Sequence, residues 1–238
     1  MINVLMPMAG ESKRFFDAGY KEPKPFIEIE GTPIFIKALE AISIDCNKIF
    51  ITKKSHSKYI KKNNLKKMKN TTIIYQNKKL NGAVETCLLA KNLINNNDNL
   101  IIVDSDQYAK FNINKAIEYF NNYDIGVITF NSSLPIYSYV KLINGEVKDI
   151  EEKNPISNNA IAGIYFWKNG SDFIKYSNLI IKNKKMINEE YYVSTAIKEA
   201  MLDGKTVGVL ECDSMQTFGT PEDLKKYLFC PHSSADRA

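Results

Sequence analysis

Two carboxylates stand directly after an apolar stretch of the chain. Asp104 and Asp106 follow the run Leu100–Val103, with Ser105 between them. Burying a carboxylate without a nearby cation is costly. A hard divalent ion offsets this cost, and Mg²⁺ prefers one or two carboxylates together with phosphate oxygens. The segment therefore predicts a magnesium site, in which Mn²⁺ can substitute.

A second group of reactive residues follows the first apolar run of the chain. The loop begins with Met8-Ala9-Gly10 and continues through Arg14 to Pro23-Lys24-Pro25. Small residues let backbone N–H groups approach an anion, and Arg14 can hold phosphate oxygens with two hydrogen bonds. The prolines restrict the backbone around Lys24, which therefore loses little entropy on contacting a ligand. The loop predicts a phosphate clamp, and an ordinary surface loop is the alternative.

A third segment has residues suited to a nucleobase. Gln76 ends an apolar run, and Asn81-Gly82-Ala83 opens a helical pattern. Gln76 offers an amide donor and acceptor, and Gly82 with Ala83 would let a flat base lie against the backbone. These residues predict a base site, although Gly82 could equally be a plain helix start. Because an amide can present either end to a pyrimidine, the choice between cytosine and uracil stays open.

The elements that must position these segments are read from the hydrophobic pattern. Apolar, β-branched runs alternate with helical patterns over the first 130 residues, which predicts an α/β fold. We expect a Rossmann-like, mostly parallel central sheet with helices on both faces. Asn144-Gly145 predicts a hairpin, and hence a small antiparallel subsheet after the parallel strands. Ligands bind beyond the carboxyl ends of such strands, which is where the three segments lie.

The expected strands are Ile2–Met6, Ile49–Thr52, Thr72–Tyr75, Leu100–Val103, Ile125–Phe130, Tyr137–Ile143, Glu146–Ile150, Ala160–Trp167 and Thr206–Leu210. The expected helices are Pro33–Ser43, His56–Met68, Gly82–Leu93, Ile113–Asn121, Gly170–Lys182 and Glu189–Asp203, with a last one from about Pro221.

Length and composition favour one compact, soluble domain. The 238 residues predict a single domain over residues 1–229 and a loose tail over residues 230–238. The four cysteines are far apart and no stretch approaches 18 apolar residues, so we expect a cytoplasmic protein without a membrane span. The net charge of +5 includes a lysine-rich stretch from Lys53 to Lys69, which we interpret as a solvated helix face rather than a nucleic-acid surface.

The N-terminal loop resembles the N-terminal motif of the sugar-phosphate nucleotidyltransferases. Arg14 and Lys24 match this motif directly, whereas Glu11 stands where the family often has a small residue and Lys13 precedes the arginine. The resemblance implies that Arg14 and Lys24 clamp the nucleotide and the departing pyrophosphate, and that Asp106 binds the metal. It assigns the nucleotide to Met8, Ala9, Gly10, Gln76, Asn81, Gly82, Ala83 and Ser105.

A second metal ligand is expected from the far end of the chain. Glu211-Cys212-Asp213 looks like the Glu-x-Asp segment of choline-phosphate cytidylyltransferases of this fold. Many sugar-phosphate relatives instead carry an aspartate just before Gly-Thr, where this chain has Thr217. The resemblance therefore makes Asp213 the preferred second ligand and Glu211 its substitute. A solvated strand end is the alternative.

The acceptor site is also assigned by resemblance. The family places a Glu-Lys pair at Glu152 and Lys153, with the lysine reaching the acceptor phosphate as a catalytic residue. Asn188–Ser194 resembles an Asn-x-Glu-aromatic-Tyr segment, which assigns Glu190 and Tyr192 to the acceptor. In isolation these two could be a helix cap and a core aromatic.

The resemblance implies transfer of CMP from CTP to a small phosphorylated acceptor, with release of pyrophosphate. The segments Ser105–Tyr108 and Glu190–Tyr192 look closest to the phosphoglutamine cytidylyltransferases of capsular phosphoramidate synthesis. L-Glutamine phosphate is therefore the first choice of acceptor, giving CDP-L-glutamine for capsular polysaccharide modification. The alternatives are a sugar-1-phosphate or phosphocholine nucleotidyltransferase, and a metal-dependent glycosyltransferase using Asp104-Ser105-Asp106. We expect neither nucleic acid nor membrane as a partner, and a homodimer as the assembly.

Overall fold

The computed structural model describes residues 1–229 of the chain, so the expected tail lies outside the described residues. Four parallel strands form one half of the central sheet, in the order β6 (Asn99–Val103), β1 (Ile2–Pro7), β4 (Asn47–Lys53) and β5 (Thr71–Gln76). These strands are rich in Ile, Val and Thr, whose branched side chains pack well on a buried sheet. Their carboxyl ends meet at one edge.

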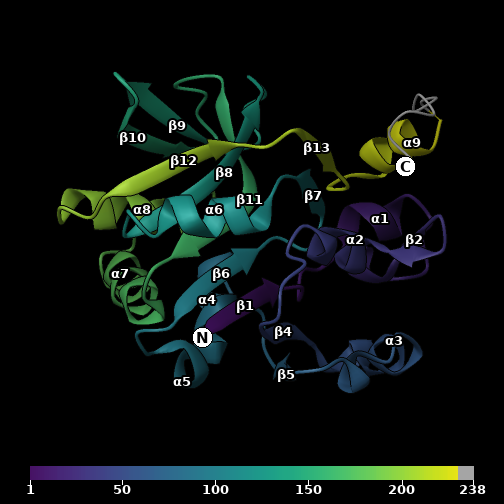
Figure 1. Ribbon diagram of the computed structural model, residues 1–238. Helices are drawn as coiled ribbons and strands as arrows, with labels where there is room; N and C mark the ends of the chain where they lie inside the picture. Colours follow the sequence, from purple (N-terminus) through teal and green to yellow (C-terminus); the bar gives the residue numbers. More distant parts are fainter. Residues whose placement is uncertain (230–238) are drawn as a thin grey trace.

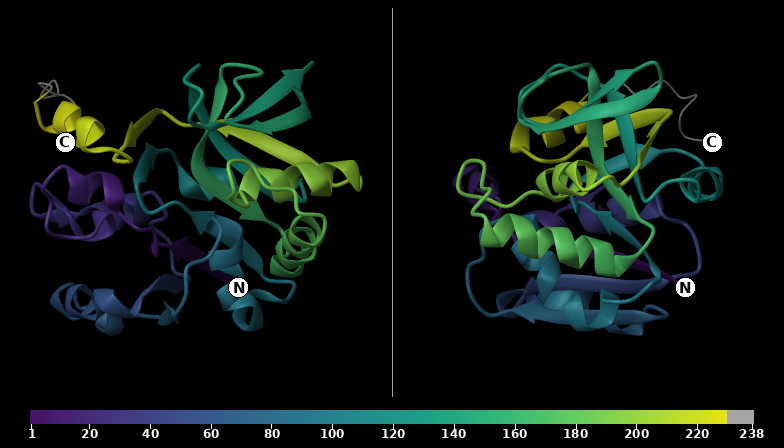
Figure 2. Two further views of the ribbon diagram at one scale, coloured as in Figure 1. Left: turned by 180° about the vertical axis from the view of Figure 1, so that it is seen from behind. Right: turned by 90° about the vertical axis from the view of Figure 1, so that its left-hand side faces the viewer.

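The other half of the sheet is mixed. β11 (Asn159–Trp167) runs antiparallel to both β6 and β8 (Ile125–Asn131), and β12 (Val207–Glu211) pairs with β8 in parallel. The expected hairpin is confirmed: β9 (Ser138–Ile143) and β10 (Glu146–Glu152) join through Asn144 and Gly145, which both have positive φ. In Figures 1 and 2 this hairpin and β12 lie at the top of the molecule, and β4 and β5 lie at the bottom.

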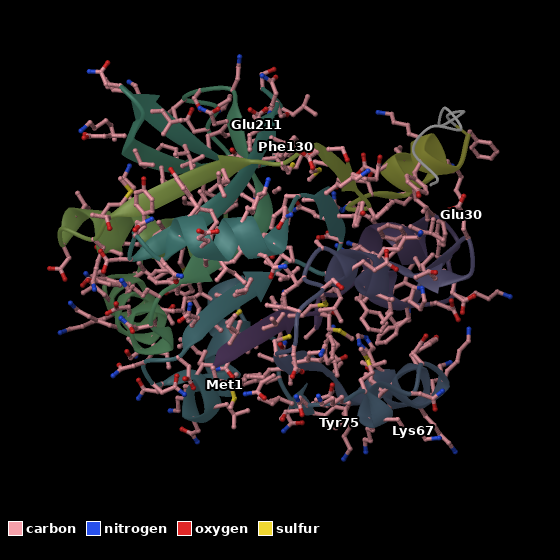
Figure 3. The ribbon with its side chains drawn as sticks, viewed as in Figure 1. Met1, Glu30, Lys67, Tyr75, Phe130 and Glu211 are labelled. Atoms are coloured by element: carbon pink, nitrogen blue, oxygen red, sulfur yellow. The ribbon has the colours of Figure 1, made fainter. Side chains whose placement is uncertain are left out.

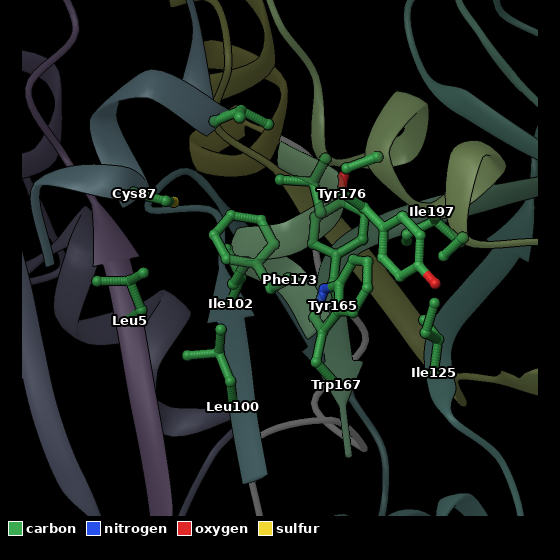
Figure 4. Close-up of a cluster of buried hydrophobic side chains, with 14 of the residues drawn as sticks. Leu5, Cys87, Leu100, Ile102, Ile125, Tyr165, Trp167, Phe173, Tyr176 and Ile197 are labelled. Carbon is green, nitrogen blue, oxygen red and sulfur yellow. The ribbon is translucent and has the colours of Figure 1, made fainter. Parts of the chain in front are cut away.

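Helices cover both faces of the sheet (Figure 1), which confirms the expected α/β fold. One face packs against α4 (Ala83–Cys87), α5 (Lys91–Ile94), α7 (Gly170–Lys182) and α8 (Val193–Leu202). The other face packs against α2 (Ile34–Glu40), α3 (Ser57–Lys62) and α6 (Ile113–Phe120). Figure 4 shows the first of these cores, where Phe173 and Tyr176 of α7 pack near Trp167 of β11 and Ile102 of β6.

A third, smaller apolar cluster joins the two ends of the chain. It includes Phe15 of α1 (Lys13–Asp17), Ile29 of β2 (Glu28–Ile29), and Leu224 of α9 (Pro221–Phe229). The two-residue β2 pairs with β3 (Thr32–Pro33), and β13 (Ser214–Thr217) pairs with β7 (Gln107–Lys110) beside them. The cluster holds α9 against the N-terminal loop, as the right side of Figure 1 shows.

Three expected helices differ from the observed ones. The stretch His56–Met68 forms α3 flanked by 3₁₀ turns at Lys54–His56 and Leu65–Lys67, because Asn64 is left-handed and ends the helix. The stretch Gly82–Leu93 forms α4 and α5 with a 3₁₀ turn at Leu88–Ala90 between them.

The third difference concerns the acceptor segment. The expected helix over Glu189–Asp203 begins only at Val193, because Asn188 and Glu189 have positive φ.

Pro33 precedes α2 rather than lying in its first turn, and Lys24–Phe26 forms a further 3₁₀ turn. The short strands β7, β13, β2 and β3 were not predicted. No helix within residues 1–229 is long and apolar enough to cross a lipid bilayer.

Candidate active site

The loop after β1 is fixed to the Pro-Lys-Pro segment. Ser12 has a left-handed backbone, and its hydroxyl accepts a hydrogen bond of 2.9 Å from the N–H of Lys24. Met8 and Ala9 are buried, and the N–H of Met8 donates to Ile51 of β4. No atom lies within 4 Å of the position that a Cβ at Gly10 would take, which leaves the backbone at Gly10 open to a ligand.

Charges near this loop are arranged around Lys24. Its Nζ lies 2.5 Å from Oδ2 of Asp106, and the two side chains are 22% and 20% exposed. Arg14 is exposed in α1, and none of the ion pairs within residues 1–229 includes it. Glu11, which departs from the family motif, pairs with Lys53 at 2.6 Å, and this hydrogen bond lowers the pKa of Glu11. The structure therefore places an ammonium group directly on the predicted metal ligand.

Asp104 lies deeper than Asp106 and against β11. Its N–H donates to the carbonyl of Gly163, and a Cβ at Gly163, whose φ is +67°, would lie 2.8 Å from Oδ2 of Asp104. Burial, followed by the negative charges of Asp106 and Glu152, raises the pKa of Asp104 to about 8, while Lys24 opposes the shift. Asp104 therefore favours its protonated, neutral form at neutral pH.

The residues predicted to bind the acceptor form one connected group. Lys153 donates a hydrogen bond to the hydroxyl of Tyr192 and lies 4.5 Å from the centre of its ring. The Tyr192 hydroxyl in turn donates to Glu190 at 2.5 Å. Lys153 follows β10 and the other two residues precede α8, so the tertiary structure brings them together.

Glu152, the last residue of β10, also contacts α8. Its buried carboxylate accepts hydrogen bonds from the hydroxyls of Ser138 and of Ser194, the latter at 2.6 Å. Burial raises the pKa of Glu152, and the two hydroxyls and Lys153 counteract part of that rise. Because the charge of Glu152 also raises the pKa of Asp104, the acceptor group and the carboxylates after β6 share one electrostatic environment.

The loop before α4 packs against the acceptor segment. A Cβ at Gly82, whose φ is +95°, would lie 2.7 Å from the carbonyl oxygen of Tyr191. The N–H of Tyr191 donates to Asn81 at 2.9 Å, and the N–H of Val84 donates back to Tyr191. Gly82 is required here because any side chain would collide with this backbone. The predicted nucleotide loop and the predicted acceptor segment are therefore one structural unit.

The remaining predicted nucleotide residues lie at the carboxyl ends of β5 and β6. Gln76 is buried, and its Oε1 accepts a hydrogen bond of 3.3 Å from the hydroxyl of Thr86, so its amide N–H groups remain available as donors. Ser105 is buried between the two aspartates, and Ala83 is partly buried in the first turn of α4.

The structure does not bring Asp213 or Glu211 to Asp106. The β7–β13 ladder sets Ser214 opposite Lys110 and Thr217 opposite Gln107, so Asp213 lies at the end remote from Asp106. Asp213 is five positions before Phe218, whose N–H donates to the carbonyl of Asp106, and five positions of extended chain span about 16 Å. Glu211 is exposed opposite Thr129, and Figure 3 shows it beside Phe130 near the top of the molecule. The prediction that Asp213 or Glu211 shares a metal ion with Asp106 is therefore wrong, because the strand register keeps both residues away from Asp106.

Asp223, rather than Asp213, lies close to Asp106. A Cβ at Gly219 would lie 3.7 Å from Oδ2 of Asp106 and 3.8 Å from Oδ2 of Asp223, so both carboxylates border the same point. In the sequence, Asp223 follows Thr220 with the spacing of a helix start, and that pattern predicts only a cap.

The donor set suits a hard cation. Within residues 1–229 no three acidic, histidine or cysteine side chains are grouped closely enough to form a complete metal site. Mg²⁺, however, takes only one or two carboxylates and completes its shell with phosphate oxygens and water. The carboxylates of Asp106 and Asp223 beside Gly219 fit that requirement.

Solved structures share this fold. A nucleoside-diphosphate-sugar pyrophosphorylase from Vibrio cholerae RC9 has a TM-score of 0.79 and 20% identity, covering 96% of this chain and 99% of that one. A Bacillus anthracis protein assigned as a glucose-1-phosphate thymidylyltransferase has a TM-score of 0.78 and 18% identity, covering 95% and 93%. The inositol-1-phosphate CTP transferase from T. maritima has a TM-score of 0.72 and 14% identity, covering 95% and 92%.

No curated protein sequence matches the chain significantly. The family model described as nucleotidyl transferase matches residues 3–218, which include the N-terminal loop, both aspartates after β6 and the acceptor segment. Members of this family generally use divalent metal ions. The chain therefore belongs to the nucleotidyl transferase family and is a nucleotidyltransferase enzyme.

Proposed function

We propose that this enzyme is a cytidylyltransferase that transfers CMP from CTP to a small phosphorylated acceptor and releases pyrophosphate. L-Glutamine phosphate is the preferred acceptor, and the product is then CDP-L-glutamine for capsular polysaccharide modification. The reaction takes place in the cytoplasm with Mg²⁺, and the assembly is a homodimer.

The observation that carries this proposal is the contact between the predicted nucleotide loop and the predicted acceptor segment. Asn81 and Gly82 pack on the backbone of Tyr191, and the neighbouring Glu190 and Tyr192 form the group that includes Lys153. A transferase that joins two substrates needs both binding regions to be adjacent and rigid. The contact between Asn81–Gly82 and Tyr191 supports this requirement.

The chain offers cations for both substrates. Lys24 and Arg14 bind the triphosphate, and Lys153 binds the phosphate of the acceptor. An acceptor oxygen attacks the α-phosphorus of CTP, a P–O bond forms to it, and the bond from this phosphorus to the oxygen bridging it to the β-phosphorus breaks. Pyrophosphate carries away that bridging oxygen and its electron pair.

A general base is not needed for the attack. A phosphate monoester with a second pKa near 6 is already largely dianionic at neutral pH. His56 is buried beneath Phe26 and Thr52 and has no role at the reacting atoms. Catalysis rests on positioning and on charge that is fixed before the reaction starts.

Asp106 is the residue that holds the metal ion in this proposal. A bound Mg²⁺ would neutralise triphosphate oxygens and favour departure of pyrophosphate. Lys24 now neutralises Asp106, so this lysine must transfer its contact to the nucleotide when both ligands are present. The ion pair thereby holds Lys24 next to the proposed site of the triphosphate.

The choice of CTP is supported by two observations. The T. maritima neighbour is a CTP transferase, and Gln76 has amide N–H groups available for the carbonyl of a pyrimidine. The choice of L-glutamine phosphate is supported by the likeness of Ser105–Tyr108 and Glu190–Tyr192 to phosphoglutamine cytidylyltransferases. Sugar 1-phosphates and phosphocholine remain the competing acceptors.

Pyrophosphate release with Mg²⁺ tests the proposal. Each nucleoside triphosphate is offered with L-glutamine phosphate, phosphocholine, glycerol phosphate, inositol 1-phosphate and a series of sugar 1-phosphates. We expect release with CTP and L-glutamine phosphate, and a product whose mass equals that of CDP-L-glutamine. Pyrophosphate release with another combination of nucleotide and acceptor would change the assigned substrates but keep the reaction class. Sugar transfer from a nucleotide sugar, without pyrophosphate release, would contradict the proposal.

A further inference from the structure

We infer that Asp223, in the first turn of α9, supplies the second carboxylate for the metal ion that Asp106 binds. This inference rests on the proposed function, because it concerns the metal that accompanies the triphosphate. It names a residue that neither the strand pattern nor the resemblance predicted.

The geometry beside Gly219 is the first argument. Oδ2 of Asp106 and Oδ2 of Asp223 each lie less than 4 Å from the position of a Cβ at Gly219. Because Gly219 has no side chain, the atom nearest to this point beyond its chain neighbours is the hydroxyl oxygen of Thr217, at 3.4 Å. Two carboxylates that border one such space can hold a hexacoordinate cation, one of them directly and the other directly or through a water molecule.

The packing of α9 makes this geometry rigid. The N–H of Phe218 donates to the carbonyl of Asp106 at 2.8 Å, which fixes the segment before α9 to the segment after β6. Phe218 and Leu224 are buried with Phe15 and Ile34 in the third apolar cluster. Both carboxylates are therefore attached to the same rigid body as the N-terminal loop.

The charge of Asp223 is the second argument. Its carboxylate is partly buried, and none of the ion pairs within residues 1–229 includes it. The Thr220 N–H and hydroxyl both donate to its Oδ2, at 2.9 and 2.7 Å, so neutral donors are its hydrogen-bond partners. A carboxylate placed beside Asp106 without a lysine or arginine of its own favours an added cation.

Other carboxylates are less suited to the task. The β7–β13 register separates Asp213 and Glu211 from Asp106, and Asp104 packs against Gly163 on β11. Thr217 has its Oγ1 only 3.4 Å from the Cβ position of Gly219, but its hydroxyl is neutral. Asp223 thus provides the negative charge that Thr217 lacks.

The test measures the gain in CTP affinity that Mn²⁺ produces, by equilibrium dialysis of CTP in Mn²⁺ and in EDTA, without an acceptor. We expect Asp106→Asn and Asp223→Asn each to reduce this gain about tenfold or more, as loss of groups in a metal's shell does. Asp213→Asn and Glu222→Gln, which change exposed carboxylates, should keep the full gain.

The substitution to asparagine protects the fold, because an asparagine oxygen can still accept the hydrogen bonds of Thr220. A second variant checks the position: Thr217→Asp combined with Asp223→Asn should recover most of the gain, since residue 217 reaches the same space. If Asp223→Asn keeps the full gain while Asp106→Asn loses it, the inference is wrong and the proposed function stands. If the wild-type protein shows no gain with any metal, the proposed function itself fails.

Discussion

The ammonium of Lys24 contacts the carboxylate of Asp106 at 2.5 Å, although 82 positions separate them in the sequence. Lys24 lies between two prolines and its N–H is bound by Ser12, while Asp106 follows a buried strand. Each residue is thus held by its own local structure before the two meet. The contact unites the predicted phosphate clamp with the predicted metal ligand.

Replacing Lys24 by alanine should therefore affect turnover more than folding. We expect kcat for pyrophosphate release to fall on the order of 10²-fold or more, because a fixed charge that stabilises the transition state is lost. Lys13→Ala, which removes an exposed lysine of the same loop, is the matched control and should stay near wild type. Near-normal turnover of Lys24→Ala would remove Lys24 from the catalytic group.

Lys153→Met should raise KM for the acceptor and leave KM for CTP almost unchanged. The reason is that Lys153 contacts Tyr192, which belongs to the predicted acceptor segment. Lys148→Met removes an exposed lysine from β10, the strand that Lys153 follows, and serves as the control. Steady-state kinetics with one substrate varied at a time gives the measurement. A larger effect on KM for CTP would place Lys153 with the nucleotide instead.

Gly82→Ala should destabilise the fold and lower the affinity of the enzyme for both substrates. The added Cβ would lie 2.7 Å from the carbonyl of Tyr191, and φ at this position is +95°. We expect a loss of about 1–3 kcal/mol in the free energy of unfolding, since strain and a backbone clash combine. Gly145→Ala has a similar φ of +79° with open space around it, so its smaller effect isolates the clash. Urea unfolding of the two variants makes the comparison, and equal losses would show that φ alone matters.

His56 should make the protein less stable in mild acid. Burial and the charge of Lys53 lower the pKa of His56 from 6.5 to about 4, and its ring is hydrogen-bonded to Thr52. Above pH 6.5 the imidazole is neutral in both the folded and the unfolded state, so it adds no pH dependence. Between pH 6.5 and 4 the unfolded chain takes up a proton that the folded state does not.

The free energy of unfolding should therefore fall by about 3 kcal/mol across this window because of His56 alone, at about 1.4 kcal/mol per pKa unit. His56→Gln keeps a hydrogen-bonding group and removes the titration, so its stability should depend less on pH over the same range. Urea unfolding of both proteins between pH 4 and 7 measures the difference. Parallel pH profiles would contradict the assignment.

The sequence by itself determined the order and type of most elements. The alternation of β-branched runs with helical patterns predicted the parallel strands, because residues that are buried on both faces must be apolar. Asn144-Gly145 predicted the hairpin, because only certain residues adopt positive φ in a two-residue turn. The sequence also made Lys24, Asp106 and Lys153 candidate site residues, since each stands in a short motif.

Helix ends were less predictable than helix positions. The sequence pattern predicts a helix over Glu189–Asp203, yet the helix starts at Val193 because the preceding residues pack on Asn81 and Gly82. A contact between segments more than 100 residues apart overrides local preference here.

Only the tertiary structure decided which carboxylate lies beside Asp106. In the sequence, Asp213 follows a strand as a metal ligand would, while Asp223 resembles a simple helix cap. The register between β7 and β13 carries Asp213 away from Asp106, and the apolar cluster around Phe218 and Leu224 brings Asp223 beside it. A strand register and the docking of a helix depend on contacts between distant segments, and the sequence pattern of either segment alone does not contain them.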